Sequence, residues 1–134
     1  YTSAAEAAAK VDGKVIGVDS DQAPIIDQYG EGMTITSAMK GLAPTVKTLL
    51  SAIVLDDTWA DYVGKIDNLG LVSENVEENY VQIPLESTQW NDGFTEDDYK
   101  ALVADMLAGK VTVDNSIDAM PEVAITVNDL GNIK

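Results

Sequence analysis

The sequence predicts a single α/β domain, residues 1–134, in which helices flank a largely parallel sheet. Short apolar runs typical of strands alternate with stretches in which apolar residues recur every three or four positions. Few hairpin turns separate these elements, which favours crossover connections and parallel pairing. The length allows one compact domain, and the apolar content of 46% is ordinary for a folded protein.

The first thirty residues contain three predicted elements. Ser3 and Glu6 have the spacing of a capping box, which begins a helix over residues 3–11. The apolar run 15–18 is typical of a strand that is buried on both faces. Proline at the start of residues 24–28 favours a short helix there.

A second strand is predicted over residues 33–36, followed by a long helix. Ser37 is placed to cap this helix, because apolar residues recur at helical spacing over 38–54. Gly41 and Pro44 lie inside that pattern. We therefore expect a kink, since proline removes one backbone donor and crowds the preceding turn.

The rest of the chain adds one strong helix and several weaker strands. Thr95 is a good cap for a helix that ends before Gly109, and three acidic residues follow it at the positive end of the helix dipole. Further strands are expected at residues 69–72, 80–83, 111–113 and 123–127.

The composition excludes several classes of function. The chain has no His, no Cys and no Arg, and 8 Lys against 23 acidic residues give a net charge of −15. Zinc, haem and iron–sulfur sites and the Ser–His–Asp triad therefore lack their residues. A surface this negative repels phosphates, so no nucleic-acid partner is expected. We expect no cofactor, no metal and no enzymatic activity.

Polar side chains follow the first two predicted strands. Asp19, Asp21 and Gln22 come after the first strand, and Ser37 and Lys40 are expected in the first turn of the helix after the second. Ligands of parallel sheets bind beyond the carboxyl ends of the strands, so these residues can share one crevice. Carboxylates accept and lysine donates, which suits a neutral ligand with several hydroxyls, such as a sugar or ribose. Ser37 can serve as cap, ligand contact or both.

Two segments resemble the basic membrane protein family. They are Val-Ile-Gly-Val-Asp-Ser-Asp-Gln at 15–22 and Ile-Thr-Ser-Ala-Met-Lys at 35–40. Members of this family are substrate-binding lipoproteins of ABC transporters, and the best-understood ones bind purine nucleosides. The resemblance implies the second, C-terminal lobe of a type I periplasmic-binding-protein fold. It also implies that Asp19, with Asp21 as the alternate, and Lys40 hold the ribose hydroxyls of a ligand closed between two lobes.

The same resemblance implies partners and a location. A full member works with an ABC permease and is lipid-anchored at the outer, extracytoplasmic side of the bacterial membrane. This chain carries no signal sequence and no cysteine for an anchor, so we expect it to represent part of a longer protein. The longest apolar stretch, residues 48–55, is far shorter than the roughly 20 residues that span a bilayer. An isolated lobe would expose a sheet edge, so a homodimer is a further expectation.

The family's base-stacking aromatic residues find no counterpart in a recognisable motif here. Trp59, Trp90 and Phe94 are expected to fill the core instead. The preference for a purine therefore comes from the resemblance alone.

Two alternatives remain at this stage. A magnesium-dependent receiver or phosphatase would use an aspartate phosphoacceptor, and the approximate spacing of a receiver is met by Asp19, Asp21, Asp67, Thr88 and Lys110. The other alternative is a structural α/β domain whose acidic surface only keeps it in solution.

Overall fold

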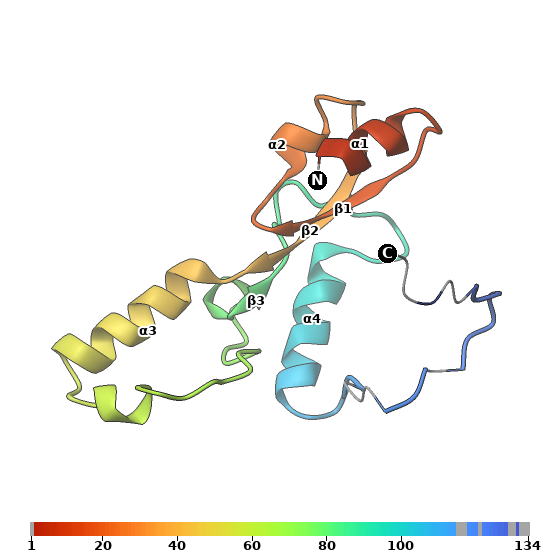
Figure 1. The fold of residues 1–134 in the computed structure, drawn as a ribbon. Helices are drawn as coiled ribbons and strands as arrows, with labels where there is room; N and C mark the ends of the chain where they lie inside the picture. Colours follow the sequence, from red (N-terminus) through yellow and green to blue (C-terminus); the bar gives the residue numbers. More distant parts are fainter. Residues whose placement is uncertain (1, 115–117, 121, 129–130, 132–134) are drawn as a thin grey trace.

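A small three-stranded sheet lies at the centre of the molecule (Figure 1). The computed structural model describes residues 2–114, 118–120, 122–128 and 131. In the sheet, β2 (Thr34–Lys40) lies between β1 (Val15–Asp19) and β3 (Val81–Gln82). β1 pairs with β2 in parallel, and β3 pairs with β2 antiparallel. The predicted α/β class is confirmed, but the sheet is small and mixed, with one parallel and one antiparallel pair.

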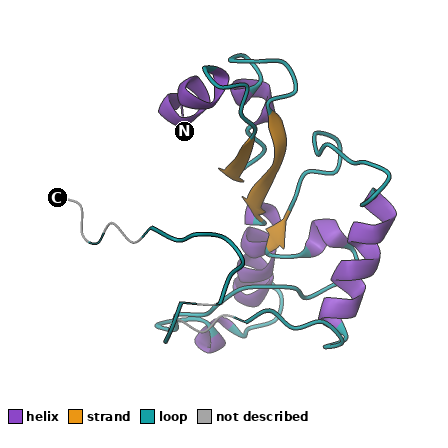
Figure 2. Ribbon diagram, turned by 90° about the vertical axis from the view of Figure 1, so that its right-hand side faces the viewer, coloured by secondary structure: helices purple, strands orange, loops and turns teal. Residues whose placement is uncertain are grey.

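The first two helices pack beside β1 and β2. Helix α1 (Thr2–Ala9) contacts β1, and the short helix α2 (Ala23–Ile26) contacts both strands. Figures 1 and 2 agree that α1 and α2 lie at one end of these strands and the other helices at the opposite end. The buried core between them consists of Ala5, Ile26 and Met33, with Ala8 and Val15 packed against it.

β1 is not buried on both faces, contrary to the sequence prediction. Gly17 faces inward, whereas Ile16 and Val18 are 64% and 53% exposed. β1 is an edge strand, and its outward side chains contact little of the described chain. A Cβ atom at Gly17 would collide with the Ser37 hydroxyl, so the absence of a side chain allows the two strands to approach.

The boundary between β2 and the next helix differs from the prediction. Residues 37–40 continue β2, because 37–39 pair with β1 in a parallel ladder and 39–40 pair antiparallel with β3, and α3 (Leu42–Val54) begins only after Gly41. The predicted Ser37 cap is therefore wrong. Pro44 falls in the first turn of α3, where its missing N–H needs no partner, so the expected kink has no cause.

Gly41 is required by close packing at this junction. Its N–H donates to the Tyr80 carbonyl at 2.8 Å, and an added Cβ would collide with the Asn79 carbonyl oxygen. The chain can therefore turn from strand to helix directly against the segment that precedes β3.

Helix α4 (Glu96–Leu107) confirms the predicted start at Thr95. The Thr95 N–H donates to Asp98 Oδ2 at 2.8 Å, and the Asp98 N–H donates to the Thr95 hydroxyl oxygen at 3.2 Å. These two bonds form a capping box. Gly109, with φ of 71°, follows the last turn and lets the chain leave the helix.

Three of the weaker strand predictions are wrong. Residues 69–72, 111–113 and 123–127 form no strand, and only Val81–Gln82 of the segment 80–83 does. In the first segment the side-chain oxygen of Asn79 accepts the N–H groups of residues 72 and 73, which replaces a strand partner. The other two segments have no neighbouring strand among the described residues with which to form backbone hydrogen bonds.

Aromatic side chains attach α4 to the rest of the molecule. Trp90 is half-buried, donates its indole N–H to the Leu85 carbonyl at 3.0 Å, and packs against Phe94 and Tyr99. Trp90 thus fills an interior position as predicted, whereas Trp59 and Phe94 are 43% and 42% exposed and do not. Within the described ranges, no helix is long and apolar enough to cross a membrane.

Candidate functional site

The ends of β1 and β2 bring together the two charged residues on which the sequence prediction depends. Asp19 is in register with Met39, so Lys40 lies beside it at the same edge of the sheet. Lys40 Nζ and Asp19 Oδ1 are 2.8 Å apart, and the side chains are 68% and 60% exposed. The predicted convergence is confirmed. Its origin differs from the prediction, because Lys40 ends a strand and does not lie on a helix.

The backbone at Asp19 adopts an uncommon conformation. Its φ is 71°, and the N–H of Ser20 donates to the Val18 carbonyl at 2.9 Å. This combination describes a γ-turn centred on Asp19, a strained geometry for a residue other than glycine. Asp19 is the last residue of β1, and strain of this kind is concentrated at functional sites.

An open cavity of about 380 Å³ adjoins the ion pair. Three of its walls are the end of β1, the end of β2 and the first turn of α3. Asp21 also lines it, as do two residues distant in sequence, Glu77 and Gln82. The N–H groups of Leu42 and Ala43, at the start of α3, have no partner within the helix, so they add donors next to Lys40. The cavity therefore offers three carboxylates, one ammonium, one amide and a helix start.

Asp21 has a structural role in addition to its position in the cavity. Its Oδ1 accepts the N–H of Ala23 at 3.0 Å, at the start of α2, and its Oδ2 accepts the Ser87 hydroxyl at 2.8 Å. Both carboxylate oxygens are thus already engaged. Asp19, paired with the exposed ammonium of Lys40, is the better of the two candidates for a ligand contact.

Gln22 and Ser37 lie away from the cavity, contrary to the prediction. Ser37 is fully buried within β2, and its hydroxyl oxygen accepts the Gln22 N–H at 3.1 Å. The Gln22 side-chain oxygen accepts the Val18 N–H at 3.2 Å. These bonds hold the loop that follows β1 against strand β2. Both residues therefore position Asp19 and are not exposed to a ligand.

Glu77 and Gln82 were not identified as site residues from the sequence. Gln82 is placed by antiparallel pairing of β3 with Met39, and its amide donates to the carbonyls of Glu77 and Asn79 at 2.6 and 2.8 Å. The sequence predicted a strand around Gln82, but it did not predict that this strand pairs with β2. Only its pairing with Met39, 43 positions earlier in the chain, brings Gln82 to the cavity.

The residues of the receiver alternative do not converge. Asp67 lines a different cavity from Asp19 and Asp21, and Lys110 Nζ is 2.7 Å from Asp105 Oδ1 at the end of α4. In the part of the chain that the structure describes, no three acidic side chains are grouped as metal ligands. This geometry gives no support to a phosphoacceptor aspartate with a magnesium site.

Comparison with known proteins identifies no relative. No protein-family model, no curated protein and no solved structure matches the chain. Membership of the basic membrane protein family therefore stays a prediction from residues 15–22 and 35–40.

Proposed function

We propose that this chain supplies one side of a binding site for a nucleoside, with Asp19 and Lys40 as the contacts to the ribose hydroxyls. The observation that carries the proposal is their 2.8 Å approach at an exposed sheet edge, next to an open cavity. As the family resemblance implies, the chain would act as the C-terminal lobe of an ABC-transporter substrate-binding protein.

The chemistry of the cavity favours a neutral ligand with several hydroxyls. A vicinal diol can donate to a carboxylate and accept from an ammonium at the same time, which matches Asp19 and Lys40. The excess of carboxylates over cations in the cavity opposes an anionic ligand such as a nucleotide. The ribose of a nucleoside meets both conditions.

The existing ion pair is no obstacle to binding. An exposed pair of this kind contributes only about 0–1 kcal/mol, so a ligand hydroxyl can separate the two groups at small cost. A hydrogen bond from a ligand to a charged group contributes about 1.5–3 kcal/mol.

Binding by this chain alone is expected to be weak. The cavity is open to solvent, and the Asp19 and Lys40 side chains are more than half exposed. A second lobe that closed over the ligand would exclude water and add the remaining contacts, including those to the base. The permease, the lipid anchor and the extracytoplasmic location proposed for the full protein rest on the family resemblance.

NMR titration of the 134-residue chain tests the proposal, because it detects millimolar binding. We expect adenosine or guanosine to shift the backbone amide resonances of Ser20 and Gly41, next to the two contacts. The free bases and the 2′,3′-dideoxynucleosides, which lack the ribose diol, should cause no such shift.

Variants that remove one charge test the two contacts, and a third variant of the same kind serves as the control. Asp19→Asn and Lys40→Met should each abolish the shifts, whereas Asp12→Asn, another exposed aspartate with positive φ, should leave them unchanged. Equal shifts in the wild type and in Asp19→Asn would show that the ribose contact is assigned wrongly. The absence of any shift at these amides would contradict the proposal as a whole.

A further inference from the structure

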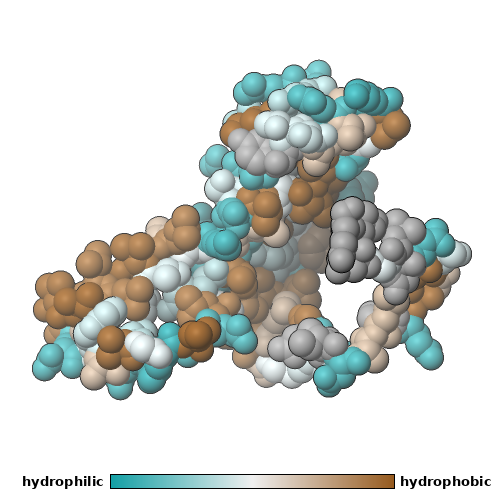
Figure 3. Space-filling view, viewed as in Figure 1, coloured by the Kyte–Doolittle hydropathy of each residue, from teal (hydrophilic) through white to brown (hydrophobic). Residues whose placement is uncertain are grey.

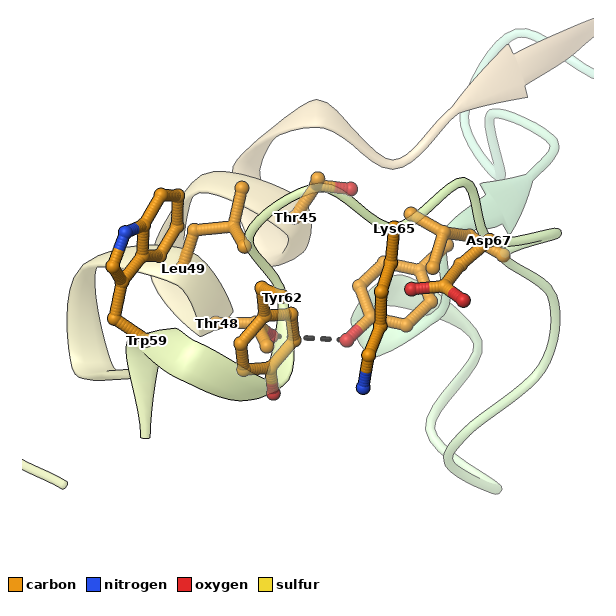
Figure 4. A pocket seen from close by; sticks show the side chains of 9 residues that line it. Thr45, Thr48, Leu49, Trp59, Tyr62, Lys65 and Asp67 are labelled. Atoms are coloured by element: carbon orange, nitrogen blue, oxygen red, sulfur yellow. Dashed lines mark hydrogen bonds between the residues drawn. The ribbon is translucent and has the colours of Figure 1, made fainter. Parts of the chain in front are cut away.

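A second cavity lies between α3, the 3-10 helix η1 (Trp59–Asp61) and the segment that leads to β3 (Figure 4). Its volume is about 260 Å³, and it shares no lining residue with the cavity at Asp19. Three aromatic side chains line it: those of Trp59, Tyr62 and Tyr80. The proposed nucleoside site does not use these three residues.

The walls of this cavity are held by hydrogen bonds. The Thr48 hydroxyl and the Tyr80 hydroxyl are 3.0 Å apart, which joins α3 to the segment before β3 (Figure 4). The Tyr80 N–H donates to the Gly70 carbonyl at 3.2 Å, and the Tyr62 N–H donates to the Trp59 carbonyl at 3.0 Å. The Tyr80 ring is thus held at its hydroxyl before any ligand arrives, which lowers the entropy cost of binding.

Polar groups of both kinds accompany the rings. Figure 4 shows Trp59 on one side of the cavity and Lys65 and Asp67 on the other, with Tyr62 between them. Asp67 can only accept hydrogen bonds and Lys65 can only donate them, while the hydroxyls can do both. One charge of each sign favours a neutral ligand that carries donors and acceptors.

We propose that this cavity binds one neutral hydroxylated ring, that is, a monosaccharide unit. The negative faces of the aromatic rings attract the C–H groups on the apolar face of a sugar. The hydroxyls at the edge of the sugar reach Asp67 and Lys65. The volume lies just below the range of about 300–1,000 Å³ for drug-sized ligands, as expected for a single ring.

The two tryptophans of the chain make the test specific. Trp59 lies in the cavity, whereas Trp90 packs against α4 and serves as an internal reference. In NMR titrations with glucose, galactose and ribose, at least one sugar should shift the indole N–H resonance of Trp59 in a saturable way. The indole resonance of Trp90 should not move.

Matched variants separate sugar recognition from other effects. Asp67→Asn should weaken binding about tenfold, because a charged acceptor is lost. Asp61→Asn, which removes the same charge from a neighbouring residue outside the cavity, should leave affinity unchanged. Asp19→Asn should also leave it unchanged, so failure of the nucleoside proposal and failure of this one are distinguishable.

Three outcomes would overturn the sugar site. They are no Trp59 shift with any of the sugars at high millimolar concentration, an equal shift with cyclohexanol, and unchanged affinity in Asp67→Asn. The second would show an apolar cavity without recognition of hydroxyls.

Discussion

At the residue scale, Gly17 is the position on which the geometry of the nucleoside site depends. A Cβ there would collide with the Ser37 hydroxyl oxygen and lie 2.9 Å from the Gln22 Cβ. Both neighbours are buried and hydrogen-bonded to each other, so neither can move without loss of that bond. Gly17 therefore allows the packing that holds Asp19 at the strand end.

We expect Gly17→Ala to lower the free energy of unfolding by about 1–3 kcal/mol, the usual cost of overpacking. Gly70→Ala is the matched control, because a Cβ at Gly70 meets no atom within 4 Å. Urea denaturation of the two variants measures the difference. Equal stability of both would show that the contact of Gly17 with Ser37 is not tight.

The capping box of α4 illustrates what single residues contribute at the element scale. Hydrogen bonds from the backbone and side chain of Thr95 hold the pKa of the Asp98 carboxyl below its ordinary value of 3.8. The pKa of Lys100 is raised by its hydrogen bond to Glu96, one turn away on the same helix. Both shifts favour the charged forms in the folded helix.

The Asp98 shift predicts a pH dependence of stability. Because its pKa is lower in the folded state, the carboxylate stabilises α4 above the unfolded-state pKa, and this contribution is lost as the pH falls through the folded value. Asp98→Asn should therefore be less stable than the wild type at neutral pH, and the difference should vanish in acid. Circular dichroism with urea at several pH values measures it.

Asp97→Asn is the control, since it removes the same charge from the same turn and keeps the capping box. Thr95→Ala should cost about 1 kcal/mol at neutral pH, a typical value for the loss of an N-cap. A pH profile of Asp98→Asn parallel to that of the wild type would contradict the proposed role of the carboxylate.

Helix α3 shows how tertiary pairing overrides a helical pattern. Its apolar periodicity begins at residue 38, yet the helix begins at 42, because residues 37–39 pair with β1 and residues 39–40 pair with β3. Periodicity alone does not distinguish these two outcomes for a short segment. The consequence for function is direct, since Lys40 reaches Asp19 as part of a strand.

At the scale of the whole molecule, α3 presents an apolar surface that the described chain leaves uncovered. Its outer side chains are more than half exposed and are visible as the apolar arm in Figure 3. They are Leu42, Val46, Leu50, Ile53 and Val54, and Leu55 follows directly after the helix. The helix contains Lys47 but no acidic residue, although the chain has a net charge of −15. Two copies can therefore approach through α3 with little charge repulsion.

We expect the chain to self-associate through α3. The association should be stronger at high salt, because salt screens the repulsion between the acidic surfaces of the two copies outside α3. Leu50→Lys should return the protein to a monomer in sedimentation experiments. Ile66→Lys adds the same charge at an exposed apolar residue outside α3 and should have no effect. A response to Val18→Lys instead would show that the copies pair through the β1 edge.

The sequence by itself determined the class of the fold, the excluded chemistries and the one local element with a strong cap, α4. These features depend on composition or on residues close together in the chain. Only the tertiary structure decided that β2 extends to Lys40, that Ser37 is buried, and that Glu77 and Gln82 line the cavity. Such features arise from strand pairing between distant segments, and that pairing leaves no local pattern.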